Sequence, residues 1–255
     1  MTSKYESFNL EIENDIANII LSRPEQLNSM SRKFWVELPE ILEEVNRNSE
    51  IRVLIISSTG KHFCAGMDLS AFDNGVANIP KEKRPDNARI GEALYRSAKE
   101  LQEYISKLEK IRVPVIAAIH GGCIGGAVDL VTACDIRLAT TDAFFCIQEI
   151  NIGMAADVGT LQRLPRIIPD SKMRELAYTG RRMLADEAKE SGLVSDVYNS
   201  QEEMVNAAKE MANEIAKKSP IAIYGLKALM NYSRDHTISD SLDFNALWRG
   251  AMLSQ

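Results

Sequence analysis

The fold of this chain is decided by residues 113–131, which read VPVIAAIHGGCIGGAVDLV. The apolar run at 113–119 predicts a strand buried on both faces of a sheet. Residues 121–126 include four glycines and predict a tight turn, after which a short helix is expected through residue 131. A strand, a glycine-rich turn and a helix in this order indicate an α/β protein.

The same alternation continues on both sides of this stretch. Asn14 and Asp15 separate two β-like runs and predict a hairpin. Strands are expected at 8–13, 16–21, 51–57, 136–139 and 144–147. Ser31 is a suitable N-cap for a helix that ends near residue 48. A further helix is expected at 88–110.

The pattern changes near residue 200, beyond which only helices are expected, at 201–217, 221–235 and 239–253. We therefore predict a core over residues 1–199 and a C-terminal helical region over residues 200–255. The apolar residues of that region exceed what a small appendage can bury alone, which favours association between subunits. Residues 74–87 contain two prolines and many charges, and we expect them to be the most mobile segment.

The composition is that of a soluble globular protein. Among 255 residues, 45% are hydrophobic and 26% are charged, and 30 Lys+Arg against 36 Asp+Glu give a net charge of −6. This acidic balance argues against nucleic acid as the main partner. No apolar run approaches the ~18 residues of a membrane span, so no membrane partner is expected.

The cysteines and histidines indicate neither a disulfide framework nor a metal centre. The four cysteines, at 64, 123, 134 and 146, form no Cys-x-x-Cys pair, and the three histidines are widely separated. The first ten residues lack the features of a signal peptide, and the last residues do not read Ser-Lys-Leu. From these observations we expect a reducing compartment and a cytoplasmic protein.

The glycine cluster at 121–126 admits several interpretations. It lacks the Gly-Lys-Ser/Thr of a phosphate-binding loop and the Gly-x-Gly-x-x-Gly spacing of a dinucleotide site. What remains is a structural turn or a place where free N–H groups of a helix's first turn meet an oxyanion. A second loop, HFCAGMDL at 62–69, also follows a predicted buried strand. Two such loops could supply two donors to one thioester oxygen.

Three carboxylates lie in apolar sequence close to these loops: Asp129, Glu149 and Asp157. Each taken alone is typical of a helix cap or of half an ion pair. Three within about thirty residues of one another, beside a candidate oxyanion loop, favour general acid–base chemistry. We expect burial to raise their pKa values and to suit them to proton transfer.

Several stretches together resemble the crotonase (enoyl-CoA hydratase/isomerase) superfamily: SRPEQLN at 22–28, FCAGMDL at 63–69, GGCIGG at 121–126, ACDIR at 133–137 and GLV at 192–194. The resemblance implies an α/β crotonase-like ββα spiral core with a C-terminal helical trimerisation region, assembled as a homotrimer or a hexamer of two trimers. It also implies that the N–H groups of Met67 and Gly126 form an oxyanion hole. Substrate binding would involve Gly126 and the loop residues Ala65, Gly66, Met67, Asp68 and Leu69.

A finer resemblance is to the Δ3,5-Δ2,4-dienoyl-CoA isomerase branch of that superfamily, carried by GGCIGGAVDL at 121–130 and AADVGTLQRLP at 155–165. Asp129, Glu149 and Asp157 fall on the three acidic active-site positions of that branch. The implied activity converts a 3,5-dienoyl-CoA thioester to the 2,4-dienoyl isomer during β-oxidation of unsaturated fatty acids. It needs no metal or redox cofactor.

Other functions remain open at this point. A 2-enoyl-CoA hydratase or a Δ3-Δ2-enoyl-CoA isomerase could use the same scaffold. A hydratase would hold water between residues 129 and 149, where the short Asp129 sets its carboxylate farther back. A non-catalytic CoA-thioester-binding or RNA-binding homologue is an alternative of another class. The intact acidic positions and the charge of −6 count against it.

Overall fold

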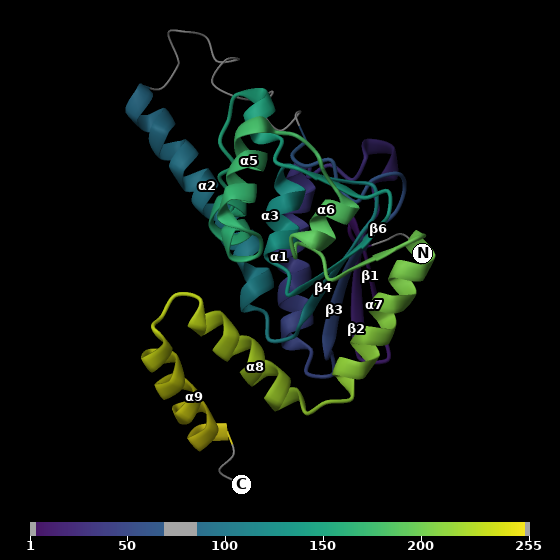
Figure 1. Cartoon of the computed structure of the whole chain (residues 1–255), viewed down its shortest axis with the longest axis vertical. Coiled ribbons are helices and arrows are strands. Elements are labelled where there is room, and N and C mark those ends of the chain that lie inside the picture. Colours follow the sequence, from purple (N-terminus) through teal and green to yellow (C-terminus); the bar gives the residue numbers. More distant parts are fainter. Residues whose placement is uncertain (1–3, 69–85, 253–255) are drawn as a thin grey trace.

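The structure is a computed structural model, and it describes residues 4–68 and 86–252. Its main sheet has six strands in the order β1-β2-β3-β4-β6-β9 (Figure 1). The strands are β1 (Phe8–Glu13), β2 (Ile16–Leu21), β3 (Val53–Ser58), β4 (Val115–Ile119), β6 (Ile136–Thr140) and β9 (Asp196–Tyr198). The first pair is antiparallel and the others are parallel. This arrangement confirms the expected α/β class.

The predicted hairpin joins β1 and β2. Asn14 and Asp15 both adopt positive φ, at 48° and 65°, which is the backbone that a two-residue hairpin turn requires. Short polar side chains tolerate this conformation better than other non-glycine residues. The turn sets the register in which Ile12 lies opposite Ala17.

Helices cover both faces of the main sheet. Every residue of β3 is buried. Alternate residues such as Leu54 and Ile56 belong to a large cluster that includes residues of α1 (Arg32–Arg47) and α2 (Asn87–Lys110). Val53 and Ile55 belong instead to a second cluster, formed with α7 (Gln201–Ala216). The residues of both clusters are buried, and a fully buried aliphatic side chain contributes roughly 1.5–3 kcal/mol.

A second, smaller sheet lies beside the first and consists of β5 (Gly122–Ile124), β7 (Phe144–Cys146) and β8 (Met183–Leu184). The turn expected at 121–126 is therefore partly wrong, because its centre is a strand. Its backbone groups are paired on both sides. Gly122–Ile124 pairs with β7, and the backbone of Cys123 forms an isolated parallel β-bridge with the backbone of Cys64. Buried N–H and C=O groups need such partners, which a local turn would not supply.

Shorter helices connect the strands, and several of them were not expected from the sequence. The structure has η1 (Pro24–Gln26), α3 (Gly126–Thr132), η5 (Glu149–Ile152), α4 (Thr160–Arg163), η6 (Leu164–Arg166), α5 (Asp170–Thr179) and α6 (Ala185–Glu190). The predicted cap of α1 is confirmed, since the Ser31 side chain accepts a hydrogen bond from the Phe34 N–H.

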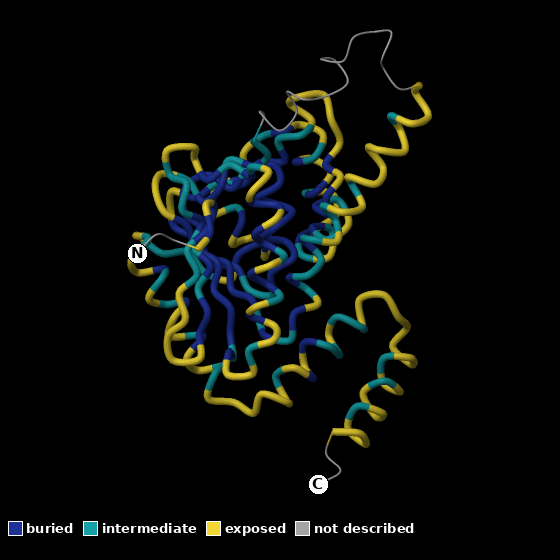
Figure 2. Tube along the Cα trace, turned by 180° about the vertical axis from the view of Figure 1, so that it is seen from behind, coloured by how far each residue is buried: buried dark blue, intermediate teal, exposed yellow. Residues whose placement is uncertain are grey.

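The C-terminal part of the chain consists of α7, α8 (Pro220–Ser233) and α9 (Ile238–Met252). Helix α7 packs on the main sheet, whereas α8 and α9 extend away from the body and are mostly exposed (Figures 1 and 2). No residue of α9 is buried. The domain boundary at 199/200 stays a prediction, and in packing terms α7 lies with the core.

No helix within residues 4–68 and 86–252 is long and apolar enough to cross a membrane. Most of the segment expected to be mobile, residues 74–85, lies outside the described residues, as does the predicted substrate-binding residue Leu69.

Candidate active site

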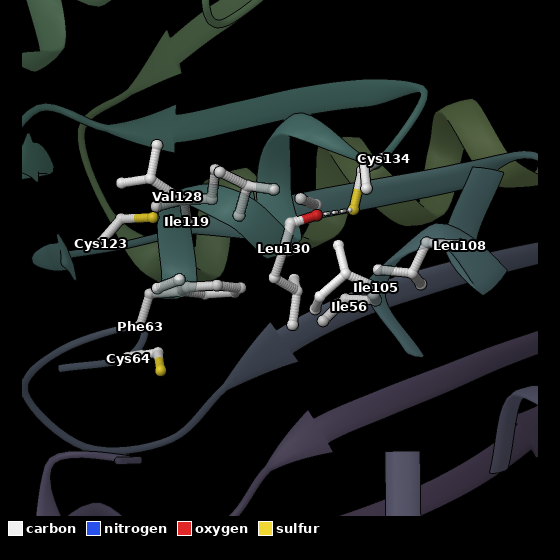
Figure 3. Close-up of a cluster of buried hydrophobic side chains, with 14 of the residues drawn as sticks. Ile56, Phe63, Cys64, Ile105, Leu108, Ile119, Cys123, Val128, Leu130 and Cys134 are labelled. Atoms are coloured by element: carbon white, nitrogen blue, oxygen red, sulfur yellow. Dashed lines mark hydrogen bonds between the residues drawn. The ribbon is translucent and has the colours of Figure 1, made fainter. Parts of the chain in front are cut away.

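The loop at residues 62–68, which follows β3, meets residues 121–126, which follow β4 and contain β5. The backbone β-bridge between Cys64 and Cys123 joins them, and a second β-bridge pairs Met30 with Met67. Phe63, Cys64 and Cys123 lie in one buried cluster with Val128 and Leu130 of α3 (Figure 3). This packing fixes both loops against the rigid core.

The two candidate donor residues lie close to one another. Gly66 has a φ of +85°, and a Cβ at this position would lie 2.5 Å from the Ile124 carbonyl oxygen, so only glycine fits. A Cβ on Gly126 would lie 4.0 Å from the Met67 nitrogen. Among the described residues, neither the Met67 N–H nor the Gly126 N–H donates a hydrogen bond. The site thus presents two neighbouring donors with unused capacity.

The rest of the first loop is held by its own hydrogen bonds. The Ala65 N–H donates to the Leu27 carbonyl at 3.0 Å, and the Asp68 N–H donates to the Met30 carbonyl at 3.1 Å. The Asp68 carboxylate accepts a hydrogen bond from Ser29 Oγ at 3.2 Å. These bonds anchor the residues on either side of Met67.

Asp129 is buried on α3, three residues after Gly126. Its Oδ1 accepts a hydrogen bond from the Thr160 N–H at 2.6 Å, at the start of α4. Burial raises the pKa of Asp129 to about 7, and the charge of Glu149 adds to the shift. The hydrogen bond from Thr160 acts in the opposite direction.

Glu149 begins η5 and lies against the glycine cluster, where a Cβ on Gly125 would be 3.2 Å from Glu149 Oε1. Its Oε2 is buried and has no hydrogen-bond partner among the described residues. Burial raises the pKa of Glu149, and the negative charge of Asp157 contributes in the same direction. A buried carboxylate oxygen without a partner is uncommon in structural roles and is available to a proton.

Asp157 departs from the expectation that all three carboxylates are buried, since it is exposed. It lies in a stretch without regular structure between η5 and α4. Its carbonyl oxygen accepts a hydrogen bond from Gln102 Nε2 of α2 at 2.7 Å. Asp157 and Glu149 are near enough to interact through their charges.

Three further residues support the site and were not anticipated. Met30 pairs with Met67, Thr160 donates to Asp129, and Gln102 holds the Asp157 carbonyl. Thr160 lies inside the stretch 155–165 that carried the finer resemblance. Nothing in the sequence links Gln102 to a residue 55 positions away. In the described part of the chain no group of His, Cys, Asp and Glu side chains could hold a metal ion.

The Enoyl-CoA hydratase/isomerase family matches residues 11–248. A mitochondrial Delta(3,5)-Delta(2,4)-dienoyl-CoA isomerase from Rattus norvegicus is 45% identical over 98% of this chain and 76% of its own length. A peroxisomal enzyme of the same name from Arabidopsis thaliana is 43% identical over 94% of this chain and 86% of its own.

Solved structures agree with the sequence comparison. A crystal structure of an enoyl-CoA hydratase from Bacillus anthracis has a TM-score of 0.86 and 30% identity, and covers 98% of this chain and 92% of that one. The chain belongs to the enoyl-CoA hydratase/isomerase family, and the expected crotonase fold is confirmed.

The expected cytoplasmic location is contradicted, because the relatives are named as mitochondrial or peroxisomal enzymes. The four cysteines are indeed free and buried. Free cysteines require only a reducing compartment, however, and do not distinguish the cytoplasm from other such compartments.

Proposed function

We propose that this protein isomerises 3,5-dienoyl-CoA thioesters to 2,4-dienoyl-CoA thioesters, as a step in oxidising unsaturated fatty acids. The relatives named for this reaction match nearly the whole chain. The observation that carries the proposal is the unpartnered, buried Oε2 of Glu149 beside two unused backbone donors.

The thioester oxygen is bound in an oxyanion hole formed by the N–H groups of Met67 and Gly126. These donors stabilise the negative charge that develops when a proton leaves C2, and one such donor is worth about 3–4 kcal/mol of barrier. The substrate itself delocalises that charge as a dienolate. The reaction therefore needs no metal or redox cofactor.

Glu149 is the base at C2, since its raised pKa and free oxygen suit it to accept a proton. Asp157 delivers a proton at C6. Asp129 orients the site through Thr160 and through its interaction with the charge of Glu149. C2 and C6 are about 5 Å apart in an extended chain, given bonds of ~1.4–1.5 Å, so two separate carboxylates serve the two ends.

The discriminating experiment compares wild type with Asp157→Asn on two substrates. The substitution preserves the shape of the side chain and removes its acid. The rate of isomerisation of a 3,5-dienoyl-CoA should fall by about 10²–10⁴-fold, which is the usual contribution of general acid–base catalysis. Turnover of a short 2-enoyl-CoA or 3-enoyl-CoA should fall much less, because Glu149 and the backbone donors remain.

Equal losses on both substrate types would exclude Asp157 from this role. Retention of full activity on the dienoyl substrate would have the same consequence. A hydratase acts only at C2 and C3, so a wild type that hydrates 2-enoyl-CoA and leaves the dienoyl substrate unchanged would favour the hydratase alternative.

We also propose that the protein assembles as a homotrimer or as a hexamer of two trimers. The exposed apolar residues of α8 and α9 support association, because they are too extensive for a stable free surface.

A further inference from the structure

The loop that carries Asp157 is held by polar bonds as well as by packing. We define the Asp157 loop as residues 154–159. Its residues Met154, Ala155 and Asp157 are exposed, whereas Ala156 and Val158 are buried in the core. A cavity of about 720 Å³ adjoins it, lined by Val158 and Gly159 of the loop and by residues of α2, η6 and α8. The exposed residues of the loop have few apolar contacts, so hydrogen bonds contribute to its position.

One guanidinium group attaches this loop in addition to Gln102, whose Nε2 donates to the Asp157 carbonyl oxygen at 2.7 Å. Arg163 Nη1 donates to the Val158 carbonyl oxygen at 3.3 Å. Gly159 has a φ of +133°, and a Cβ there would lie 1.7 Å from the same nitrogen. The Arg163 side chain therefore occupies the space that any larger residue at 159 would need. Its position and the loop backbone are mutually fixed.

The guanidinium is itself fixed by α2. Arg163 Nε and Nη2 both donate to Glu109 Oε2, at 2.9 and 2.7 Å, and Nη2 also donates to Ser106 Oγ at 2.9 Å. The side chains of Arg163 and Glu109 are only 14% and 19% exposed. Partly buried, multiply bonded pairs of this kind are more rigid than surface ion pairs.

The attachment extends to the C-terminal helices. Glu109 Oε1 accepts a hydrogen bond from Arg234 Nη1 at 2.6 Å, just beyond the end of α8. The Glu109 carbonyl oxygen accepts another from Asn231 of α8 at 2.9 Å. Glu109 thus joins α8 to the guanidinium that holds the Asp157 loop.

We propose that Arg163 is a positioning residue for proton delivery by Asp157. This inference rests on the proposed isomerase function. Arg163 holds the backbone of Val158 and Gly159, next to Asp157, so that the Asp157 carboxylate stays within reach of C6. Arg163 forms no hydrogen bond with the thioester donors or with Glu149, and its charge lowers the pKa of Asp129. We therefore expect substrate binding and proton removal at C2 to depend on it much less than proton delivery by Asp157.

The test compares Arg163→Ala with Arg166→Ala. Arg166 lines the same cavity and binds the Arg234 carbonyl and Asp235, but has no bond to the Asp157 loop. For Arg163→Ala, kcat on 3,5-dienoyl-CoA should fall about tenfold to a hundredfold, which is the cost of a misplacement near 1 Å. KM should remain within about twofold, since the binding contacts persist. Arg166→Ala should leave both constants near wild type.

Chemical rescue distinguishes loss of the guanidinium contacts from general damage to the fold. The space left by Arg163→Ala is continuous with the cavity, so added guanidinium at a non-denaturing concentration can enter it. We expect guanidinium to restore much of the lost kcat in Arg163→Ala and none in Asp157→Asn. Should Arg163→Ala fail to fold, Arg163→Lys serves in its place. It keeps the charge but not the fork of donors, and it should lower kcat with KM unchanged.

An unchanged kcat, a rise in KM alone or a loss that guanidinium leaves unaltered would each overturn the positioning role. A loss in Arg166→Ala equal to that in Arg163→Ala would overturn it as well. The wild-type measurement separates this failure from failure of the proposed function. Wild type that does not convert 3,5-dienoyl-CoA would overturn both.

Discussion

A substitution at Gly126 can distinguish a glycine cluster that binds the thioester oxygen from one that has only a structural role. A Cβ here would lie 2.9 Å from Met30 Sδ and 4.0 Å from the Met67 nitrogen. The branches of a valine would therefore extend toward the space between the two donors. We expect Gly126→Val to lower kcat/KM by about 10²–10³, as loss of an oxyanion donor does.

The Gly126→Val protein should remain folded by circular dichroism, because no carboxylate or core side chain is removed. Gly126→Ala is the matched control, and it should retain more activity because only one methyl group is added. Near-normal turnover by Gly126→Val would show that the glycine cluster has only a structural role.

The raised pKa of Asp129 predicts how the stability of the folded protein depends on pH. Burial holds its folded-state pKa near 7, above the ordinary 3.8. A raised pKa favours the protonated folded state, so this stabilisation is complete below about pH 4 and is lost as pH rises through 7. Asp129→Asn abolishes this titration and keeps an Oδ1 that can accept from Thr160.

The stability of Asp129→Asn relative to wild type should therefore increase between pH 5 and pH 8, by up to about 3 kcal/mol at about 1.4 kcal/mol per pH unit. Urea unfolding at several pH values measures this difference. Asp243→Asn, at an exposed position of α9, should show no comparable trend. A difference independent of pH would contradict the raised pKa.

At the scale of single residues, motifs in the sequence predicted the candidate acidic site residues, but they did not predict the side chains that hold these residues in place. Asp129, Glu149 and Asp157 lie in stretches specific enough to be recognised, and the charges of the three carboxylates do interact. Gln102 and Arg163 act through side-chain bonds to the Asp157 loop, and such bonds leave no periodicity in the sequence. Exposure of Asp157 was also unpredictable, since its apolar neighbours suggested the opposite.

At the scale of elements, α8 is attached to the body by a buried lysine. Lys227 Nζ donates to Asp135 Oδ2 at 2.8 Å and to the carbonyl oxygens of Leu108 and Val113, each at 2.9 Å. Burial lowers the pKa of Lys227, and the charge of Asp135 opposes that shift. Removing one partner of a buried pair leaves the other uncompensated.

We therefore expect Lys227→Met to lower the free energy of unfolding by about 3–5 kcal/mol. Lys209→Met, at an exposed position of α7, is the control and should change it by less than about 0.5 kcal/mol. Urea unfolding measures both variants. Equal stability of the two would mean that the Lys227 bonds contribute little.

Elements defined by long apolar periodicity were predictable, and elements defined by distant pairing were not. Helices α1, α2 and α7 and the buried strands β3 and β4 have patterns visible over many residues. Strands β5, β8 and β9 have two or three residues each, and they exist because a neighbouring strand pairs with them. Single-chain patterns do not carry that information.

At the scale of the whole molecule, α8 and α9 present an apolar surface that the body does not cover. Ile238, Leu242 and Leu247 are 81%, 63% and 71% exposed. On its other side, α8 is attached to the body by polar bonds. Lys227 is bonded to Asp135, and Arg234, just beyond α8, is bonded to Glu109. One side of this region is thus joined to the core and the other is available to a second copy of the chain.

We expect light scattering at micromolar concentration to give the mass of three or six copies of the 28.4 kDa chain.

Leu242→Glu combined with Leu247→Glu should shift the protein toward monomer, because charges in an apolar contact are poorly solvated. Asn245→Glu adds one such charge at an exposed polar position of α9 and should disturb assembly less. Because α8 is bonded to Glu109, and Glu109 to Arg163, the dissociated double variant should also lose dienoyl isomerisation. A stable wild-type monomer would contradict the assembly. Full activity in a monomeric double variant would show that the helical arm and the Asp157 loop act independently.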